Sequence, residues 1–290
     1  MLKIERILVP IVFGGTSWHV VQQAAWLARR FRAEVTLVHV VMPPSYPVGM
    51  IGETEISAQD LHTRILQRAQ IDLDEVQGPE LNGIAVERVV RTGDPAREIV
   101  DAARDLNVGL IMMPTHGHGA FYRLLLGSVT AKVLHEIDCP VWTGVHLEEP
   151  PPREFSIRHV LCSVDLKPHS QHTVTLASEF AAAVDATLTL VHVTAGAEVF
   201  GPGGSYVDSV WEEKIVGFAA DEIASLQKCL GTTAEVIIHS GNVPQLLNRA
   251  AEQSGADVLV IGHIPGDSHL GDNGNGYGII RESNVPVLSL

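Results

Sequence analysis

Apolar residues in the first half of the chain gather into short continuous runs, each bounded by polar or glycine-bearing segments. Continuous runs of about four to eight apolar residues are typical of strands that are buried on both faces of a sheet. Five such runs predict strands at residues 6–12, 34–41, 84–90, 108–113 and 141–145. Glycines and prolines in residues 42–54 predict an irregular loop after the second strand.

Amphipathic segments fill most of the intervals between these runs. Thr16 or Ser17 can cap a helix after the first strand, and the apolar residues that follow share one helix face: Val20, Ala24, Leu27 and Ala28. Pro95 opens another helix, because proline suits a first turn. Further helices are predicted at residues 57–76 and 128–135. Strands that alternate with helices predict a parallel sheet covered on both faces.

The same succession of segments recurs in the second half of the chain. The pentapeptide TLVHV stands at residues 36–40 and again at 189–193, and the first run at 6–12 resembles residues 159–165. The segment that begins at Arg91 resembles the one at His239, and the DCPV motif at Asp138 resembles NVPV at Asn284. Four related blocks in one order indicate a duplicated domain.

A proline-rich, charged segment separates the two copies. The residues EEPPPREF at 148–155 are typical of an extended linker. This boundary predicts one domain at residues 1–147 and a second at residues 156–290. We refer to them as copy one and copy two.

Composition and charge narrow the classes of partner. The net charge of −14 argues against nucleic acid and against an anionic membrane, because both require a basic surface. A nucleotide remains compatible, since backbone amides can hold phosphate whatever the global charge. Three cysteines without a CxxC spacing, no signal peptide and no apolar run of membrane-spanning length predict a cytoplasmic protein.

The loop after the fourth strand of copy one carries the candidate chemistry. Gly117 and Gly119 permit positive φ and close approach of the backbone to a ligand, so that successive amides form an anion nest. Gly127 then turns the chain into a helix that begins near Ser128. The free amides of that first turn favour phosphate oxygens, and the Ser128 and Thr130 hydroxyls can also donate. The loop has no lysine, and its nearby cations are His116, His118 and Arg123.

These motifs resemble the universal stress protein family in its tandem form. The resemblance rests on the ILVP start, the LVHV second strand, the TGDPAREIVDAARD segment, the THGHG loop, LLLGSVTAKVL and the closing CPV. It implies two open, twisted, five-stranded parallel sheets of the adenine nucleotide α-hydrolase type, with strand order 3-2-1-4-5. It also implies that two domains pair through their last strands, here within one chain, with a further homodimer left open. Many members of the family bind ATP.

The family's loop pattern is met only in part by each copy. Gly117, nine intervening residues and Gly127-Ser128 fit it, whereas Pro114 replaces its first glycine and Val12 replaces an acidic residue that contacts the nucleoside. Copy two has the acidic residue, Asp165, but lacks the Gly-Ser. Copy one is therefore expected to keep the phosphate end of the site and copy two the nucleoside contact.

The resemblance and the loop together give a set of candidate ATP-binding residues. In copy one these are Pro10, Ile11, Val12, Val40, Met113, Pro114, His116, Gly117, His118, Gly119, Gly127, Ser128, Val129 and Thr130. In copy two, with less support, they are Asp165, Val193 and Gly262. The nucleoside is expected across Pro10, Ile11 and Val12, with or without Mg²⁺ on the phosphates. Loss of the acidic contact at Val12 costs about 1.5–3 kcal/mol of affinity.

Other chemistries receive less support from the sequence. Asp165, His169 and His172 are spaced as zinc ligands could be, but a solvated helix start explains the same pattern. His39 and His192 occupy equivalent strands, which indicates a structural position. No Ser-His-Asp order or paired-carboxylate arrangement stands out in the sequence, so we predict no enzyme beyond very slow ATP hydrolysis. The leading hypothesis is a nucleotide-binding stress-response protein that senses or regulates, and the alternatives are a scaffold with empty pockets or a metal-dependent hydrolase.

Overall fold

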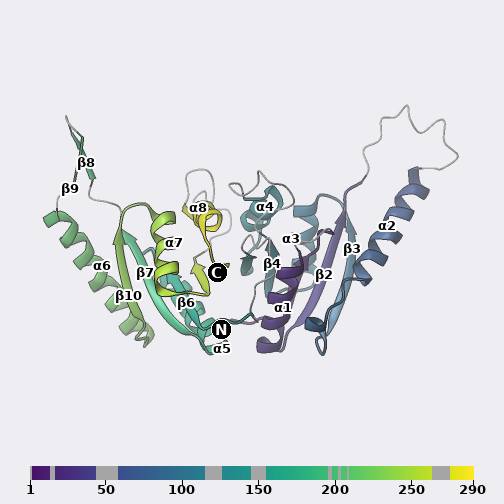
Figure 1. The fold of residues 1–290 in the computed structure, drawn as a ribbon, viewed down its shortest axis with the longest axis horizontal. Coiled ribbons are helices and arrows are strands. Elements are labelled where there is room, and N and C mark those ends of the chain that lie inside the picture. Colours follow the sequence, from purple (N-terminus) through teal and green to yellow (C-terminus); the bar gives the residue numbers. More distant parts are fainter. Residues whose placement is uncertain are drawn as a thin grey trace.

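The computed structural model shows two α/β copies joined into one long sheet (Figure 1). The structure describes residues 2–13, 17–43, 58–114, 126–144, 155–194, 198–201, 204–207, 209–262 and 275–290. None of the helices in these ranges is long and apolar enough to cross a membrane. The predicted linker at 148–155 lies outside the described residues except for Phe155, so the exact domain boundaries stay a prediction.

Copy one contains the predicted alternation of strands and helices. Its elements are β1 (Arg6–Pro10), α1 (Ser17–Phe31), β2 (Glu34–Val41), α2 (Ala58–Asp74), a 3₁₀ turn (Pro79–Leu81), β3 (Val86–Thr92), α3 (Pro95–Asp105), β4 (Leu110–Pro114), α4 (Ser128–Glu136) and β5 (Val141–Gly144). The second strand has the predicted bounds, and the first ends two residues earlier than predicted. Pro95 begins α3 after Asp94, whose side chain accepts the Arg97 amide at 3.1 Å.

Copy two repeats this order of strands and α-helices with one addition, and its described residues contain no counterpart of the 3₁₀ turn. Its elements are β6 (His159–Ser163), α5 (Ser170–Ala183), β7 (Thr187–Thr194), β8 (Glu198–Gly201), β9 (Gly204–Val207), α6 (Ser209–Leu230), β10 (Glu235–Ser240), α7 (Val243–Ser254), β11 (Val258–Ile261), α8 (Asn275–Glu282) and β12 (Val287–Ser289). The addition is an antiparallel pair of β8 and β9 that precedes α6. Asn242 caps α7 by accepting the Gln245 amide at 3.1 Å, as Asp94 caps α3.

The strand order confirms the predicted fold class. The ten strands run β10-β7-β6-β11-β12-β5-β4-β1-β2-β3, so each copy has the order 3-2-1-4-5. Within each copy the neighbouring strands are parallel, and the last strands, β5 and β12, pair antiparallel with Trp142 opposite Leu288. The two copies therefore meet through their last strands within one chain, and both edges of the long sheet are third strands.

Helices cover both faces of the sheet, and each face has its own apolar layer. One layer contains the buried side chains of α1 and α5, joined by Leu73 of α2 and Ile223 of α6. The other layer contains those of α3, α4, α7 and α8. The α1 face predicted from the sequence, Val20, Ala24, Leu27 and Ala28, is buried in the first of these layers.

The seam between the copies is also closed on its outer faces. Helices α4 and α8 stand beside each other at the centre of the molecule (Figure 1), and the Tyr277 hydroxyl of α8 donates to the Ala131 carbonyl of α4 at 2.9 Å. On the opposite face Phe31 of α1 stacks on Phe180 of α5 with ring centroids 6.0 Å apart. Arg30 and Asp185 join the same two regions by an ion pair at 2.7 Å.

Candidate functional site

The candidate site of copy one begins at the carboxyl ends of two neighbouring strands. Strands β1 and β4 are adjacent and parallel, and the strand order reverses between them. In open α/β sheets, ligands bind in the crevice outside the strand ends at this reversal. Pro10 ends β1 and Pro114 ends β4, so both lie at this edge of the sheet. Ile11 is buried beyond β1, whereas Val12 is exposed.

Helix α4 begins close to the end of β4. Gly127 is its N-cap, with φ −58° and ψ 138°, and the helix starts at Ser128 as predicted. These angles suit any residue, so the turn itself does not require a glycine at this position. The first backbone N–H groups of a helix have no partner within the helix and carry the positive end of its dipole. Ser128 is exposed and Val129 half-buried, so this end of α4 reaches solvent.

A side-chain hydrogen bond fastens α4 to the end of β4. The Thr130 hydroxyl donates to the Pro114 carbonyl at 3.1 Å, and Thr130 is buried. A hydroxyl has one proton to donate, so this bond removes Thr130 from the donors that we expected to contact phosphate. A contact with phosphate would require this bond to break, and it stays a prediction. Thr130 instead holds the start of α4 against the strand end, and Ser128 is left as the exposed hydroxyl.

His116, Gly117, His118 and Gly119 lie outside the described residues, as does Arg123. The convergence of the loop amides with those of α4 therefore stays a prediction. Met113, at the end of β4, is buried under this edge of the sheet.

The second strand of each copy holds the end of the first strand by the same pair of bonds. In copy one the His39 Nδ1 lies 2.9 Å from the Ile11 carbonyl oxygen, and the Ile11 amide donates to the Val38 carbonyl at 2.8 Å. Because a carbonyl only accepts, Nδ1 of this histidine carries the proton. Val40, the predicted nucleoside neighbour, is half-buried in β2, one residue beyond His39.

Copy two repeats this arrangement at its own strand ends. The His192 Nδ1 lies 2.6 Å from the Val164 carbonyl oxygen, and the Val164 amide donates to the Val191 carbonyl at 2.9 Å. Val193 is half-buried as Val40 is. The repetition supports the structural interpretation of the two histidines, because each one fixes the chain where it leaves the sheet.

The carboxylate of Asp165 is engaged within copy two. Its Oδ1 accepts the Ser170 hydroxyl at 2.6 Å and the Lys167 amide at 3.1 Å, and its Oδ2 lies 3.1 Å from His169 Nε2. Burial by itself would raise the pKa of Asp165, but the Ser170 and Lys167 hydrogen bonds and the charges of His169 and Lys167 outweigh it and lower the pKa. Asp165 therefore organises the turn that enters α5.

The neighbouring end of β11 lies close to the same turn. A Cβ placed on Gly262 would lie 2.9 Å from the Thr173 hydroxyl and 3.2 Å from a His169 ring carbon, so only glycine fits there without a shift. Gly262 is exposed, but one side of it lies close against the first turn of α5. His169 pairs with Asp165, and the described part of the chain contains no group of three histidine, cysteine, aspartate or glutamate side chains that could hold a metal.

One charged side chain near the start of α4 was missed by the sequence reasoning. Lys132 lies one helical turn beyond Ser128, and its ammonium is 3.7 Å from Asp94, the N-cap of α3. The hydrogen bond from the Arg97 amide, with smaller contributions from the Lys132 charge and the Ala96 amide, holds the pKa of Asp94 below its ordinary value against the opposing effect of burial. The spacing of four residues from Ser128 is the signal in the sequence, since it places Lys132 on the same helix face.

Comparison with known proteins places both copies in one family. The sequence model of the universal stress protein family matches residues 3–143 and again residues 156–289. A universal stress protein from Mycolicibacterium smegmatis is 28% identical over 211 residues, which cover 72% of this chain and 69% of that protein. Another, from Methanocaldococcus jannaschii, is 30% identical over 139 residues, or 47% of this chain and 79% of that protein.

A solved structure reproduces the tandem arrangement. The crystal structure of a universal stress protein from Archaeoglobus fulgidus matches with a TM-score of 0.67 at 20% sequence identity. The match covers 98% of this chain and 95% of that chain. At this level of identity the similarity concerns the fold, and it extends over both copies.

Proposed function

The chain belongs to the universal stress protein family, and from this premise we propose that copy one binds an adenine nucleotide, ATP, in the crevice between β1 and β4. The observation that carries the proposal is the position of α4. Its N-terminus is fastened by Thr130 to the end of β4, at the edge where the strand order reverses. A helix start with free amides at that edge is suited to an anionic phosphate.

The remaining residues divide between the two ends of the nucleotide. The amides of Ser128 and Val129 are proposed to hold phosphate oxygens, together with the loop from His116 to Gly119 and with or without Mg²⁺. Pro10, Ile11, Val12 and Val40 are proposed to line the nucleoside end. The exposed Val12 contacts the nucleoside through apolar atoms only, so affinity is lower than an acidic residue would give, by about 1.5–3 kcal/mol.

Nucleotide binding in this proposal serves sensing or regulation of partners during stress, and the chain is not an efficient enzyme. Any ATP hydrolysis is expected to be slower than about 0.01 per second, some three orders of magnitude below a typical turnover number. Release of ADP from purified protein under single-turnover conditions measures this rate directly.

Copy two is proposed to bind nucleotide less well or not at all. The Asp165 carboxylate is occupied by Ser170, Lys167 and His169, and the turn that carries His169 lies close to Gly262. A nucleoside hydroxyl would have to compete with these contacts. The two copies are thus expected to give one nucleotide per chain.

A substitution at the start of α4 tests the proposal. Ser128→Pro removes one backbone donor, yet proline is favoured at the first helical position, and the extended ψ of Gly127 suits a residue that precedes proline. Loss of one hydrogen bond to a charged group weakens ATP binding by about 10- to 150-fold. Asn275→Pro, at the first position of α8, is the matched control and should leave affinity unchanged.

Calorimetric titration with Mg-ATP measures these affinities, and mass spectrometry of gently released ligand identifies a co-purified nucleotide. Absence of heat with wild type, or equal affinity in Ser128→Pro, would overturn the proposal. The alternative function, a scaffold of the same fold with empty pockets, predicts that outcome.

A further inference from the structure

Helix α6 of copy two presents large apolar side chains to solvent. Val210, Trp211 and Phe218 are 62%, 56% and 65% exposed, whereas Ala219 and Ile223 on the inner face are buried. Trp211 and Phe218 are seven residues apart and therefore share one face of the helix. An exposed apolar stripe on a long helix is a mark of an interaction surface.

The equivalent helix of copy one has a different outer face. Ala69 and Leu73 are the buried residues of α2, as Ala219 and Ile223 are of α6, and this correspondence aligns Phe218 with Arg68. Arg68 forms an ion pair with Asp72, one turn further on, at 2.6 Å. In copy two that solvated pair is replaced by Phe218 and Glu222. The fold does not require an apolar residue at this position, because copy one is charged there.

The charges on the outer face of α6 are arranged so that the α6 helices of two separate chains can complement each other in charge. The residues three and four positions from Lys214 are Val210, Trp211, Gly217 and Phe218, so this ammonium has no acidic partner at helical spacing. Glu222 likewise has no cation at helical spacing. Lys214 lies four residues before Phe218 and Glu222 lies four residues after it.

We propose that this face of α6 is the contact surface of a homodimer, in which the two α6 helices pack antiparallel about a two-fold axis at Phe218. The symmetry places Lys214 of each protomer opposite Glu222 of the other protomer, so each dimer has two such contacts. Gly217 has nothing within 4 Å of where a Cβ would lie and leaves space for the second Phe218 ring. This proposal is independent of nucleotide binding.

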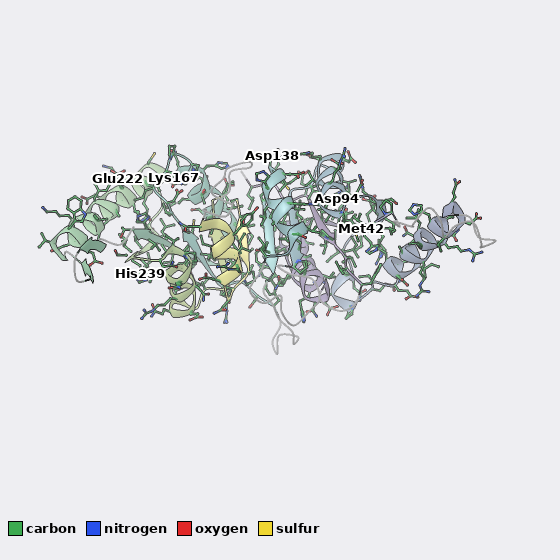
Figure 2. The ribbon with its side chains drawn as sticks, turned by 90° about the horizontal axis from the view of Figure 1, so that it is seen from above. Met42, Asp94, Asp138, Lys167, Glu222 and His239 are labelled. Atoms are coloured by element: carbon green, nitrogen blue, oxygen red, sulfur yellow. The ribbon has the colours of Figure 1, made fainter. Side chains whose placement is uncertain are left out.

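Helix α6 is remote from the seam between copy one and copy two, so the proposed dimer contact does not compete with that seam. Helix α6 flanks β10 at one end of the long sheet, far from β5 and β12 (Figure 1). Glu222 lies toward this end of the molecule in Figure 2, and Met42 lies in the opposite half. An isologous contact at one end closes into a dimer and does not extend into a fibre. An anionic membrane is a poor occupant of the same face, because the chain carries a net charge of −14.

Sedimentation velocity of the full chain at about 0.15 M salt, where charges are screened over about 8 Å, tests the dimer over a range of protein concentrations. Phe218→Asp is expected to raise the dimer dissociation constant at least 30-fold, as removal of a central aromatic contact does. Arg68→Asp is the matched control, because it places the same residue beside an acidic neighbour on α2, and it should leave the constant unchanged. Far-UV circular dichroism confirms that both variants are folded.

A charge exchange tests the two-fold arrangement. Lys214→Glu alone brings four acidic side chains together and should weaken the dimer about tenfold, and Glu222→Lys alone should also weaken it. The double variant restores both contacts with reversed polarity and should return to within about threefold of wild type. Monomeric wild type up to about 200 µM, or a dimer unaffected by Phe218→Asp, overturns the proposal. Equal weakening by Arg68→Asp overturns it in favour of a head-to-tail contact between α6 and α2.

Discussion

A buried hydrogen bond at the seam between the copies offers a test of how the two halves are held together. The Trp142 indole of β5 is fully buried and donates to Gln23 Oε1 of α1 at 2.8 Å. The ring also lies against Phe155, the last residue of the linker, and Phe180 of α5, at centroid distances of 6.4 and 6.3 Å. Gln23 is itself only 5% exposed, so neither partner has water to replace the other.

The second copy shows that an apolar pair can stand at the same position. The residues that correspond to Gln23 and Trp142 in the repeat are Leu176 and Leu288. Leu288 is buried directly opposite Trp142 across the seam, and Leu176 packs on the same apolar layer. The polar pair in copy one is therefore not demanded by the fold, and its value depends on both partners being present.

Because the hydrogen bond stabilises the protein only when both Gln23 and Trp142 are present, the single and double variants should differ in their loss of unfolding free energy. Gln23→Leu leaves the buried indole N–H without an acceptor and is expected to lower the free energy of unfolding by about 1–3 kcal/mol. Trp142→Phe removes the donor and also leaves a small cavity, for a loss of about 2–4 kcal/mol. In the double variant no polar group is left unpaired, so the loss should fall short of the sum by about 1 kcal/mol.

Urea unfolding followed by far-UV circular dichroism measures these free energies. Gln22 is the matched control, because it lies next to Gln23 on α1 but donates to Glu80 at 3.0 Å, away from the seam. Gln22→Leu combined with Trp142→Phe should be additive. A coupling energy for the Gln23 and Trp142 pair within about 0.3 kcal/mol of zero would refute the reasoning, as would equal coupling in the Gln22 cycle.

Three further predictions concern single positions. Thr130→Val should lower the free energy of unfolding in urea by about 1–2 kcal/mol, because the carbonyl at the end of β4 loses its donor, and Thr130→Ser should retain most of that stability. The pKa of Asp165 in the folded protein lies below its ordinary value, so its ionised carboxylate stabilises the fold above about pH 4. This contribution to the free energy of unfolding disappears as the pH falls through the folded pKa. The difference in stability between wild type and Asp165→Asn, at most about 1 kcal/mol after solvent screening, should therefore shrink in acid. Burial raises the pKa of both the Cys139 and the Cys162 thiol to about 12. Iodoacetamide at pH 8 should therefore add a single group to the native protein, at the exposed Cys229. A second rapid adduct in the intact mass would contradict this.

The sequence predicts most of the fold because the buried strands leave a direct trace in it. A strand covered on both faces must be apolar throughout, and the run from Glu34 to Val41 was therefore located to the residue. Strand β3 is at the edge of the sheet and only partly buried, so its pattern is weaker and its bounds shifted from 84–90 to Val86–Thr92. The repeat then carried the same topology into copy two.

The sequence could not predict how individual polar groups are used. A threonine at the third position of a helix has several possible acceptors, and only the structure pairs Thr130 with Pro114. The sequence also did not predict the apolar outer face of α6. A periodic hydrophobic pattern indicates which residues share a helix face, but it does not show which face packs on the sheet. Comparison with Arg68 of copy one supplies that information only once the buried positions of both helices are known.

The end of the first strand shows that one position can serve two separate purposes. In copy two, Asp165 accepts from Ser170 and from the Lys167 amide, so its carboxylate holds the turn into α5 whether or not a ligand is present. In copy one the same position is Val12, whose side chain has no hydrogen-bond acceptor, so it cannot make these contacts. An acidic residue here is thus evidence of a structural requirement as much as of a nucleoside contact. It follows that the valine in copy one counts less against nucleotide binding than the family pattern alone implies, because part of what an acid does at this position is independent of any ligand.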